Sequence, residues 1–290
     1  MRDLQGNAAE PDWLAMAVIW CNGEWQDSNQ SGVSWSDRGL MHGLGLFETL
    51  LALDGAPVQV ERHLARLQKG LDRFAWTSPE ADLKAAMTEL LERNSLTEGR
   101  ARIRLAITGG SGVLNDLGAG KDQKLWMTAS ALTEGKSSLS LGLSLWRRNA
   151  DSPLVGLKCA SYAENLMAMD WAREAGFDDV LFVNTAGNLC EAAMANLFLV
   201  KDGALLTPNL ESGCLPGVTR ELVLELARGM KIPVFQESLS LTDLKQADEC
   251  FLTSATRGPV PVSSFEGRSF EVGPVTARLA QAWEHSLSPH

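Results

Sequence analysis

The chain has 290 residues, 45% hydrophobic and 21% charged, a composition that is ordinary for a globular protein and sufficient for one large or two moderate domains. The formal net charge of −10 argues against nucleic acid or an anionic membrane surface as the main partner. No apolar run approaches the ~20 residues that cross a bilayer, and the polar residues 1–11 do not resemble a secretory signal. The five cysteines are far apart and form no C-x-x-C pair, so we expect no zinc site, no disulfide scaffold and a cytoplasmic location.

The first half of the chain alternates strand-like and helix-like patterns after an extension, residues 1–14, that we expect to be frayed. A predicted strand over 15–21 is followed by Asn22-Gly23, a strong hairpin signal. Apolar residues spaced by three and four over 60–74 predict an amphipathic helix. Ser78, as an N-cap before a proline, predicts the start of a second helix that runs to about 94. Further apolar runs predict strands at 44–53, 101–108 and 124–131, and residues 36–39 predict a turn.

The second half begins after a polar linker at 134–138, where we place a domain boundary. Its strands and helices do not alternate regularly, which favours an α+β fold over a doubly wound parallel sheet. The predicted helices are 161–175, 216–228 and 274–286. The predicted strands are 139–146, 179–184, 189–190, 195–201, 204–207, 232–237, 249–253 and 260–262.

One lysine, Lys158, stands between a turn-rich loop and a predicted helix, in a stretch with few other cations. A lysine among apolar neighbours loses solvation of its charged form, which lowers the pKa of the amine and makes it a usable nucleophile. Such amines form Schiff bases with carbonyl compounds, including the aldehyde of pyridoxal phosphate. Most lysines are simply solvated, so the other groups of a pyridoxal phosphate site have to be found elsewhere in the chain.

Three other segments contain groups of the required kinds. Glu191, among small and apolar residues at a strand start, needs a cationic partner such as a protonated pyridine nitrogen. Pro216 and Gly217 open a predicted helix whose first amides and dipole favour a phosphate, and Thr219 adds a hydroxyl. Arg66 lies beside the buried edge of its helix, where its guanidinium can reach a phosphate. Taken singly, each segment also fits an ordinary role: a solvated strand end, a common helix start or a surface charge.

In their order along the chain, these motifs resemble those of the class IV aminotransferases, the fold-type IV pyridoxal phosphate enzymes. That family includes branched-chain and D-amino acid aminotransferases, (R)-selective amine transaminases and aminodeoxychorismate lyase. The resemblance covers nearly the whole chain, from about 18 to 262. It rests on Asn22-Gly23, Ser36-Asp37-Arg38-Gly39, Gly45-Leu46-Phe47-Glu48-Thr49, His63-Leu64-Ala65-Arg66-Leu67, Lys158, Glu191 with Asn196-Leu197-Phe198, and Leu215-Pro216-Gly217-Val218-Thr219-Arg220.

The resemblance implies a two-domain α+β enzyme, with a smaller α/β sandwich over 15–135 and a larger pseudo-barrel over 136–290, that assembles as a homodimer. It implies that Lys158 forms the Schiff base with pyridoxal 5′-phosphate and moves a proton, and that Glu191 pairs with the pyridine nitrogen. Both residues are present, which disfavours a non-enzymatic relative of the family.

The resemblance also assigns the rest of the cofactor site. Ala255 stands where many aminotransferases have a phosphate-binding threonine, so the expected donor at that strand end is Ser254 or Thr256. A second departure is Ala193, which stands where many members of the family have a serine or threonine. Tyr162 is expected to hydrogen-bond the phenolic oxygen, and Arg66 and helix amides to bind the phosphate. The expected cofactor-binding residues are Arg66, Lys158, Tyr162, Glu191, Leu215, Val218, Thr219, Ser254 and Thr256.

Transamination and lyase chemistry share this site and differ at the substrate. The expected substrate-binding residues are Phe47, Thr49, Arg102 and Arg104, with the two arginines binding a carboxylate. These segments are similar to the lyase pattern, but Leu51 stands where that pattern has an arginine that a dianionic substrate needs. A tyrosine-lined branched-chain pocket is disfavoured because Tyr162 is the only tyrosine. We therefore expect amino-group transfer from a D-amino acid or (R)-amine to a 2-oxo acid such as pyruvate. The alternative is aminodeoxychorismate lyase, giving 4-aminobenzoate and pyruvate.

Overall fold

The computed structural model describes residues 18–29, 32–77 and 79–287, which form two compact units, one ending at Thr133 and the other beginning at Glu134. The predicted extension 1–14, the first three residues of the predicted strand 15–21, and Ser78 lie outside the described residues. The predicted domain bounds, 15–135 and 136–290, stay a prediction. None of the helices in the described part of the chain combines the length and the hydropathy that crossing a membrane takes.

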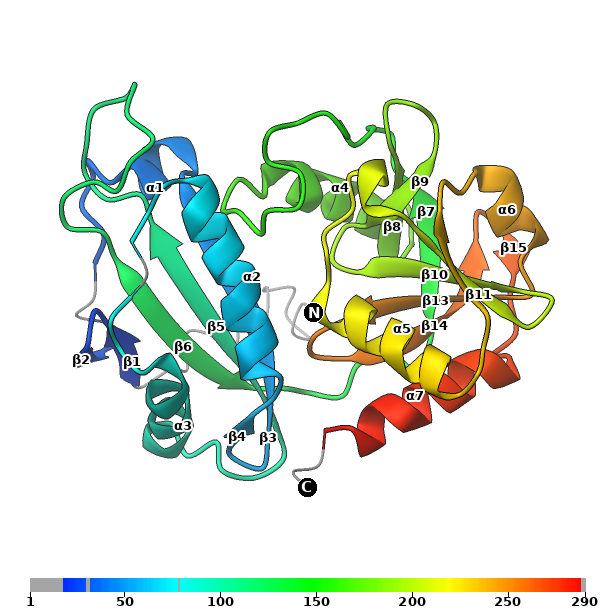
Figure 1. Cartoon of the computed structure of the whole chain (residues 1–290), viewed down its shortest axis with the longest axis horizontal. Coiled ribbons are helices and arrows are strands. Elements are labelled where there is room, and N and C mark those ends of the chain that lie inside the picture. The colour runs from blue at the N-terminus through cyan, green and yellow to red at the C-terminus, as the bar shows by residue number, and fades with distance from the viewer. Residues whose placement is uncertain (1–17, 30–31, 78, 288–290) are drawn as a thin grey trace, which may run out of the picture. The chain divides into compact units, whose positions relative to one another are not determined.

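The first unit is built on an antiparallel sheet, whose described strands number six in the order β2-β1-β6-β5-β3-β4 (Figure 1). Asn22 and Gly23 form the predicted hairpin turn between β1 and β2, both with positive φ, 49° and 92°. The bounds are β1 Val18–Cys21, β2 Glu24–Asp27, β3 Gly45–Leu53, β4 Ala56–Pro57, β5 Arg100–Thr108 and β6 Leu125–Ala131.

Helices α2 (Val60–Arg73) and α3 (Leu83–Arg93) pack on this sheet, α2 on β3 and α3 on β1 and β6. The spacing of apolar residues over 60–74 correctly predicted α2. The predicted start of α3 at Ser78 is wrong, because Asp82 is the N-cap and its carboxylate accepts a hydrogen bond from the Ala85 amide at 3.0 Å. The predicted turn at 36–39 leads instead into a short helix, α1 (Arg38–His42), with Asp37 as N-cap.

The second unit contains a closed barrel. Its strands run in the order β12-β11-β10-β13-β14-β7-β8-β9, and β9 pairs back with β10, which closes the ring. The barrel interior is filled by leucines and valines from alternate strand positions, such as Leu141, Leu181, Leu197 and Leu252. The bounds are β7 Leu139–Leu143, β8 Asp179–Val183, β9 Leu189–Ala192, β10 Asn196–Lys201, β11 Ala204–Pro208, β12 Val234–Glu237, β13 Glu249–Ser254, β14 Gly258–Phe265 and β15 Arg268–Ser269.

Helices cover the outside of this barrel. Helices α5 and α7 lie against the barrel strands (Figure 1). Along β10, Leu197 and Leu199 belong to the cluster inside the barrel, whereas Phe198 and Val200 pack with residues of α5 and α7. Each such fully buried side chain contributes about 1.5–3 kcal/mol of hydrophobic stabilisation. Strand β15 and helix α6 were not predicted, and α5 begins at Val218 rather than at Pro216, because Gly217 is extended and acts as its N-cap. The bounds are α4 Ala163–Glu174, η2 Leu210–Ser212 (a 3-10 helix), α5 Val218–Gly229, α6 Leu241–Gln246 and α7 Pro274–His285.

Candidate active site

Lys158 lies half-buried in the loop before α4. Its Nζ is 5.7 Å from the ring centroid of Tyr162, a cation–π distance. Two residues earlier, Gly156 has a positive φ of 79°, and a Cβ there would lie 4.0 Å from Cδ of Pro216. The loop of the lysine therefore runs beside the segment that leads into α5.

Glu191, on β9, is tied to the same segment by its carboxylate. Its Oε2 accepts hydrogen bonds from the Leu215 amide at 2.9 Å and from Nδ2 of Asn196 at 3.2 Å. Nδ2 of Asn196 also donates to the Leu215 carbonyl at 2.8 Å. The carboxylate is thus held in place by a backbone donor and a buried amide, as a group that must meet a specific partner requires. Asn196 was part of a quoted motif, but nothing in the sequence gave it a role.

The start of α5 has the features of an anion site. Its N-cap, Gly217, makes no side-chain capping bond, so the first-turn amides of Val218 and Thr219 receive no cap from a side chain. The helix dipole adds positive potential at this end. Glycine is required at 217, because a Cβ there would lie 2.0 Å from Oδ1 of Asn196. Pyridoxal 5′-phosphate needs a lysine for its aldehyde, a carboxylate for its ring nitrogen and amide donors for its phosphate. Lys158, Glu191 and the start of α5 supply these groups, so the residues fit that cofactor.

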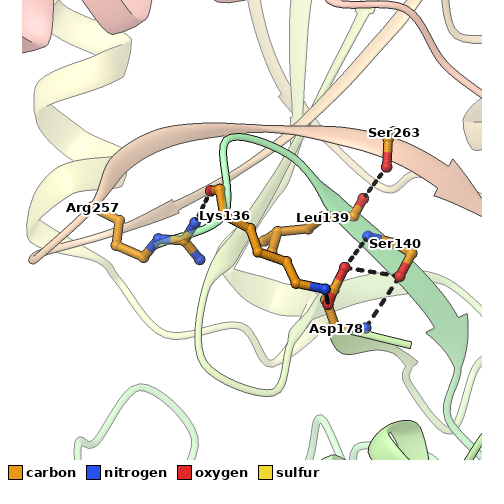
Figure 2. Close-up of polar contacts among 6 residues, drawn as sticks. All are labelled: Lys136, Leu139, Ser140, Asp178, Arg257 and Ser263. Atoms are coloured by element: carbon orange, nitrogen blue, oxygen red, sulfur yellow. Dashed lines mark hydrogen bonds and ion pairs between the residues drawn. The ribbon is translucent and has the colours of Figure 1, made fainter. Parts of the chain in front are cut away.

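The turn between β13 and β14 lies beside Asn196, which pairs in register with Thr253. Oγ1 of Thr253 is buried and has no hydrogen-bond partner among the described residues. Both predicted phosphate donors are half-buried: Ser254 is the last residue of β13, and Thr256 lies in this turn. The next residue, Arg257, reaches back to donate to the Lys136 carbonyl (Figure 2).

Figure 2 also shows the polar contacts that hold the start of the second unit in place. The Asp178 carboxylate accepts hydrogen bonds from Nζ of Lys136 at 2.5 Å and from the amide and hydroxyl of Ser140 at 2.8 and 2.9 Å. The Ser263 hydroxyl donates to the Leu139 carbonyl at 3.2 Å. These bonds hold the entry into β7 against β8 and β14.

Arg148 is a residue of this unit that the sequence did not single out. Its Nη1 donates to Glu164 at 2.6 Å and to Asn165 at 3.3 Å, and its guanidinium lies 4.3 Å from the ring centroid of Phe182. Asn165 in turn donates to the Ala193 carbonyl at 2.6 Å. Arg148 therefore links the start of α4 to the backbone just after Glu191. Only its place in the loop before Lys158 hinted at this role.

A buried carboxyl group, that of Asp179, supports the turn that follows Glu191. Asp179 accepts hydrogen bonds from the amides of Val180 at 2.7 Å and Ala193 at 3.1 Å. Burial raises the pKa of Asp179 to about 6, although these amide hydrogen bonds act in the opposite direction. With its pKa raised to about 6, this carboxyl group holds the backbone between β9 and β10.

In the first unit, Arg66 is held by a buried carboxylate, Glu48. Nε of Arg66 donates to Oε1 at 2.8 Å and Nη2 donates to Oε2 at 2.6 Å, while Nδ1 of His63 lies 2.7 Å from Oε2. Burial alone would raise the pKa of Glu48, but the hydrogen bonds from Arg66 and His63 outweigh it and lower that pKa. Glu48 orients the guanidinium, and the role of Arg66 at a phosphate stays a prediction.

The opposite face of the same sheet carries a cavity of about 670 Å³. Side chains alternate along β3, so Glu48 faces α2 whereas Thr49 lines this cavity. Arg102 and Arg104 line it as well, and Arg102 donates to the Ser130 hydroxyl at 3.1 Å. Phe47, the fourth predicted substrate residue, is buried beneath Arg104, whose guanidinium carbon is 4.1 Å from its ring centroid.

The structure thus brings the predicted residues together in two groups, one per unit. Thr49, Arg102 and Arg104 share the cavity of the first unit. In the second unit, Lys158 with Tyr162, and Glu191 with Leu215, lie around the segment that leads into α5. The chemical role assigned to each of these residues stays a prediction.

Relatives of this chain were found by sequence and by structure. Branched-chain-amino-acid aminotransferase of Escherichia coli strain K12 is 31% identical in an alignment that covers 91% of this chain and 91% of its own. Aminodeoxychorismate lyase of Bacillus subtilis strain 168 is 26% identical and covers 93% of this chain and 94% of its own. The crystal structure of the T.th. branched-chain amino acid aminotransferase with pyridoxamine 5′-phosphate superimposes with a TM-score of 0.85, at 25% identity over 94% of each chain.

These likenesses confirm the predicted two-domain α+β, fold-type IV architecture and the resemblance drawn from the motifs. The family model for amino-transferase class IV matches residues 45–265. Because this match spans most of the sequence, the chain belongs to the class IV aminotransferases, enzymes that depend on pyridoxal 5′-phosphate.

Proposed function

We propose that the chain moves an amino group from a D-amino acid to a 2-oxo acid such as pyruvate. The observation that carries this proposal is the cavity lined by Arg102 and Arg104. Two guanidinium groups suit a substrate with a carboxylate, which a plain (R)-amine lacks, so an amino acid is the better donor. The lining contains no tyrosine among the described residues, as expected for a pocket unlike the tyrosine-lined branched-chain type.

The residues of the second unit supply the remaining roles in this proposal. Bound pyridoxal 5′-phosphate would provide an electron sink for charge that develops at the substrate α-carbon. Lys158 would hold the cofactor and carry the proton on Nζ, and Glu191 would accept a hydrogen bond from the ring nitrogen. The amides of Val218 and Thr219 would bind the phosphate.

Two other functions have specific support. The name of the Escherichia coli relative favours a branched-chain amino acid as donor. The Bacillus subtilis relative and the cationic cavity favour the lyase that makes 4-aminobenzoate and pyruvate. These three functions differ in the substrate that reacts, so one set of assays separates them.

The test is to mix purified enzyme, checked for its yellow colour, with D-alanine, L-leucine or aminodeoxychorismate in separate reactions. We expect D-alanine with a 2-oxo acid acceptor to give pyruvate and a new amino acid. Reaction with L-leucine alone would assign the branched-chain function, and formation of 4-aminobenzoate alone would assign the lyase. Lys158→Ala should abolish the colour and the activity together. A colourless wild type that gains no absorbance with added cofactor would refute the cofactor roles.

We further propose that the enzyme is a homodimer located in the cytoplasm. Exposed apolar side chains of the first unit, Trp35, Leu40, Met41 and Leu114, suit contact with a second copy. The five cysteines are all buried and unpaired, which suits a reducing compartment. Sedimentation of the purified protein tests the assembly, and a monomer at working concentrations would contradict it.

A further inference from the structure

The first turn of α5 contains a buried arginine, Arg220, that has no role so far. It is 2% exposed, and its Nη2 donates hydrogen bonds to the Pro208 carbonyl at 2.9 Å and to Oε1 of Gln236 at 3.0 Å. Its Nε is buried without a hydrogen-bond partner among the described residues, and none of their carboxylates forms an ion pair with its guanidinium. Because a buried charge without an opposite charge is costly, this arginine suits a site that receives an anion.

The side chain of Arg220 spans the two ends of the segment that leads into α5. Side chains of a helix point back toward its N-terminus, and Arg220 reaches Pro208, the last residue of β11. Between these two residues lie Leu215, whose amide donates to Glu191 at 2.9 Å, and Gly217, the N-cap of α5. Burial lowers the pKa of the Arg220 guanidinium, and the negative charge of Glu191 acts in the opposite direction. The cation is therefore within electrostatic reach of the groups expected to bind the cofactor.

We propose that Arg220 is a positioning residue for the cofactor phosphate, whose buried charge gives the chain a preference for pyridoxal 5′-phosphate over pyridoxal. This inference rests on the proposed function, in which the amides of Val218 and Thr219 bind the phosphate. The charge of Arg220 adds to the positive potential at the start of α5, and burial limits its screening by water and salt. Its hydrogen bond to Pro208 also fixes the segment that leads into those amides. A phosphate dianion gains from this charge, whereas pyridoxal, with a neutral hydroxyl in place of the phosphate, does not.

The first test changes the charge beside Arg220 and leaves its hydrogen bond in place. Gln236 is exposed on β12, so Gln236→Glu keeps an oxygen acceptor for Nη2 and adds a negative charge that offsets the guanidinium. The matched control is Gln246→Glu on α6, another exposed glutamine, whose Oε1 accepts a hydrogen bond from Nζ of Lys201 at 2.9 Å. The measurement is the Kd of pyridoxal 5′-phosphate and of pyridoxal, by absorbance titration of the cofactor-free protein. We expect Gln236→Glu to weaken binding of the phosphorylated form at least fivefold, with pyridoxal, and both ligands in the control, within twofold of wild type.

The second test changes the arginine itself, with a control arginine in the same unit. Arg220→Met removes the charge and Arg220→Lys keeps it, whereas Arg268→Met deletes a guanidinium that also donates to two carbonyls, of Leu244 at 3.0 Å and Ala247 at 2.8 Å. We expect Arg220→Met to weaken binding of pyridoxal 5′-phosphate at least tenfold more than that of pyridoxal, and Arg220→Lys to recover most of the difference. Arg268→Met should leave the ratio of the two affinities within twofold of wild type. Thermal unfolding checks that the variants fold, and Gln236→Glu decides the question if Arg220→Met does not.

The two ligands separate the proposed role from a purely structural one. An arginine that only stabilises the fold would affect both ligands alike, so equal losses, or no loss in the Gln236 and Arg220 variants, would overturn the proposal. A wild type that binds pyridoxal as tightly as pyridoxal 5′-phosphate would overturn it as well, together with the phosphate role of α5. A wild type that prefers the phosphorylated form but transfers no amino group would contradict the proposed function alone, and the titrations would still decide the role of Arg220.

Discussion

Asn196 joins the carboxylate of Glu191 to the segment before α5, so removing its amide should weaken the cofactor site. The substitution Asn196→Ala deletes the hydrogen bonds from Nδ2 to Glu191 and to the Leu215 carbonyl. A bond to a neutral carbonyl contributes about 1 kcal/mol and one to a charged group about 1.5–3 kcal/mol. The free energy of unfolding should therefore fall by roughly 2.5–4 kcal/mol.

Part of this loss should appear as weaker cofactor binding, because Glu191 and the start of α5 lose their common support. Each ~1.4 kcal/mol expressed in binding costs a factor of ten in affinity, so we expect pyridoxal 5′-phosphate to bind 10–100-fold more weakly. The assay is an absorbance titration of the cofactor-free protein. Asn196→Asp should bind still more weakly, because it places a second carboxylate beside Glu191.

The matched control is Asn94→Ala in the first unit. Nδ2 of Asn94 also donates two hydrogen bonds, to the carbonyls of Val18 at 3.0 Å and Leu90 at 2.9 Å. This variant should lose stability without a change in cofactor affinity. If Asn196→Ala binds the cofactor as wild type does, or if both variants lose affinity equally, the link between Glu191 and α5 does not support the site.

Three further substitutions have defined outcomes. The raised pKa of Asp179, about 6, means that the folded state binds the proton of this carboxyl group more tightly than the unfolded state does. The protonated group therefore adds to the free energy of unfolding in acid, and this stabilisation is lost as pH rises from about 4 through 6. The free energy of unfolding of Asp179→Asn, measured by chemical denaturation, should therefore rise by up to about 3 kcal/mol relative to that of wild type between pH 4 and pH 7.5. A difference between the two proteins that does not change with pH would contradict this. Glu249 accepts hydrogen bonds from the Val275 and Thr276 amides at 3.1 and 2.7 Å, so Glu249→Ala should lower the melting temperature by several degrees, and an unchanged transition would rule out this cap. Arg104→Ala should raise KM for amino acids more than for plain amines, and equal effects would remove its assigned role.

Local patterns predicted the elements well and their polar contacts poorly. The leucine spacing over 60–74 determined α2 because burial of one helix face depends only on nearby residues. The start of α5 moved by two residues because Gly217 is held against Asn196, a residue on a distant strand.

The same limit applies to the candidate site. Lys158 and Glu191 were found from motifs, but Asn196, which holds Glu191, comes from another strand. The pairing of Arg66 with Glu48 joins residues 18 positions apart, and Lys124 lines the same cavity as Arg102 and Arg104, which come from another strand. Side-chain contacts between residues far apart in the sequence have no local sequence signal, so motifs alone could not show them.

The hydrogen bond from Arg257 to Lys136 decides where the chain can be cut. Lys136 and Asp178 form an ion pair, and a Cβ at Gly135 would lie 2.9 Å from Nε of Arg257, so residues 135–138 belong structurally to the second unit. A fragment that starts at Glu134 keeps the hydrogen bond between Arg257, in the β13–β14 turn, and Lys136, whereas a fragment that starts at Leu139 loses it. Fusions, affinity tags or protease sites intended to separate the units therefore belong before Gly135.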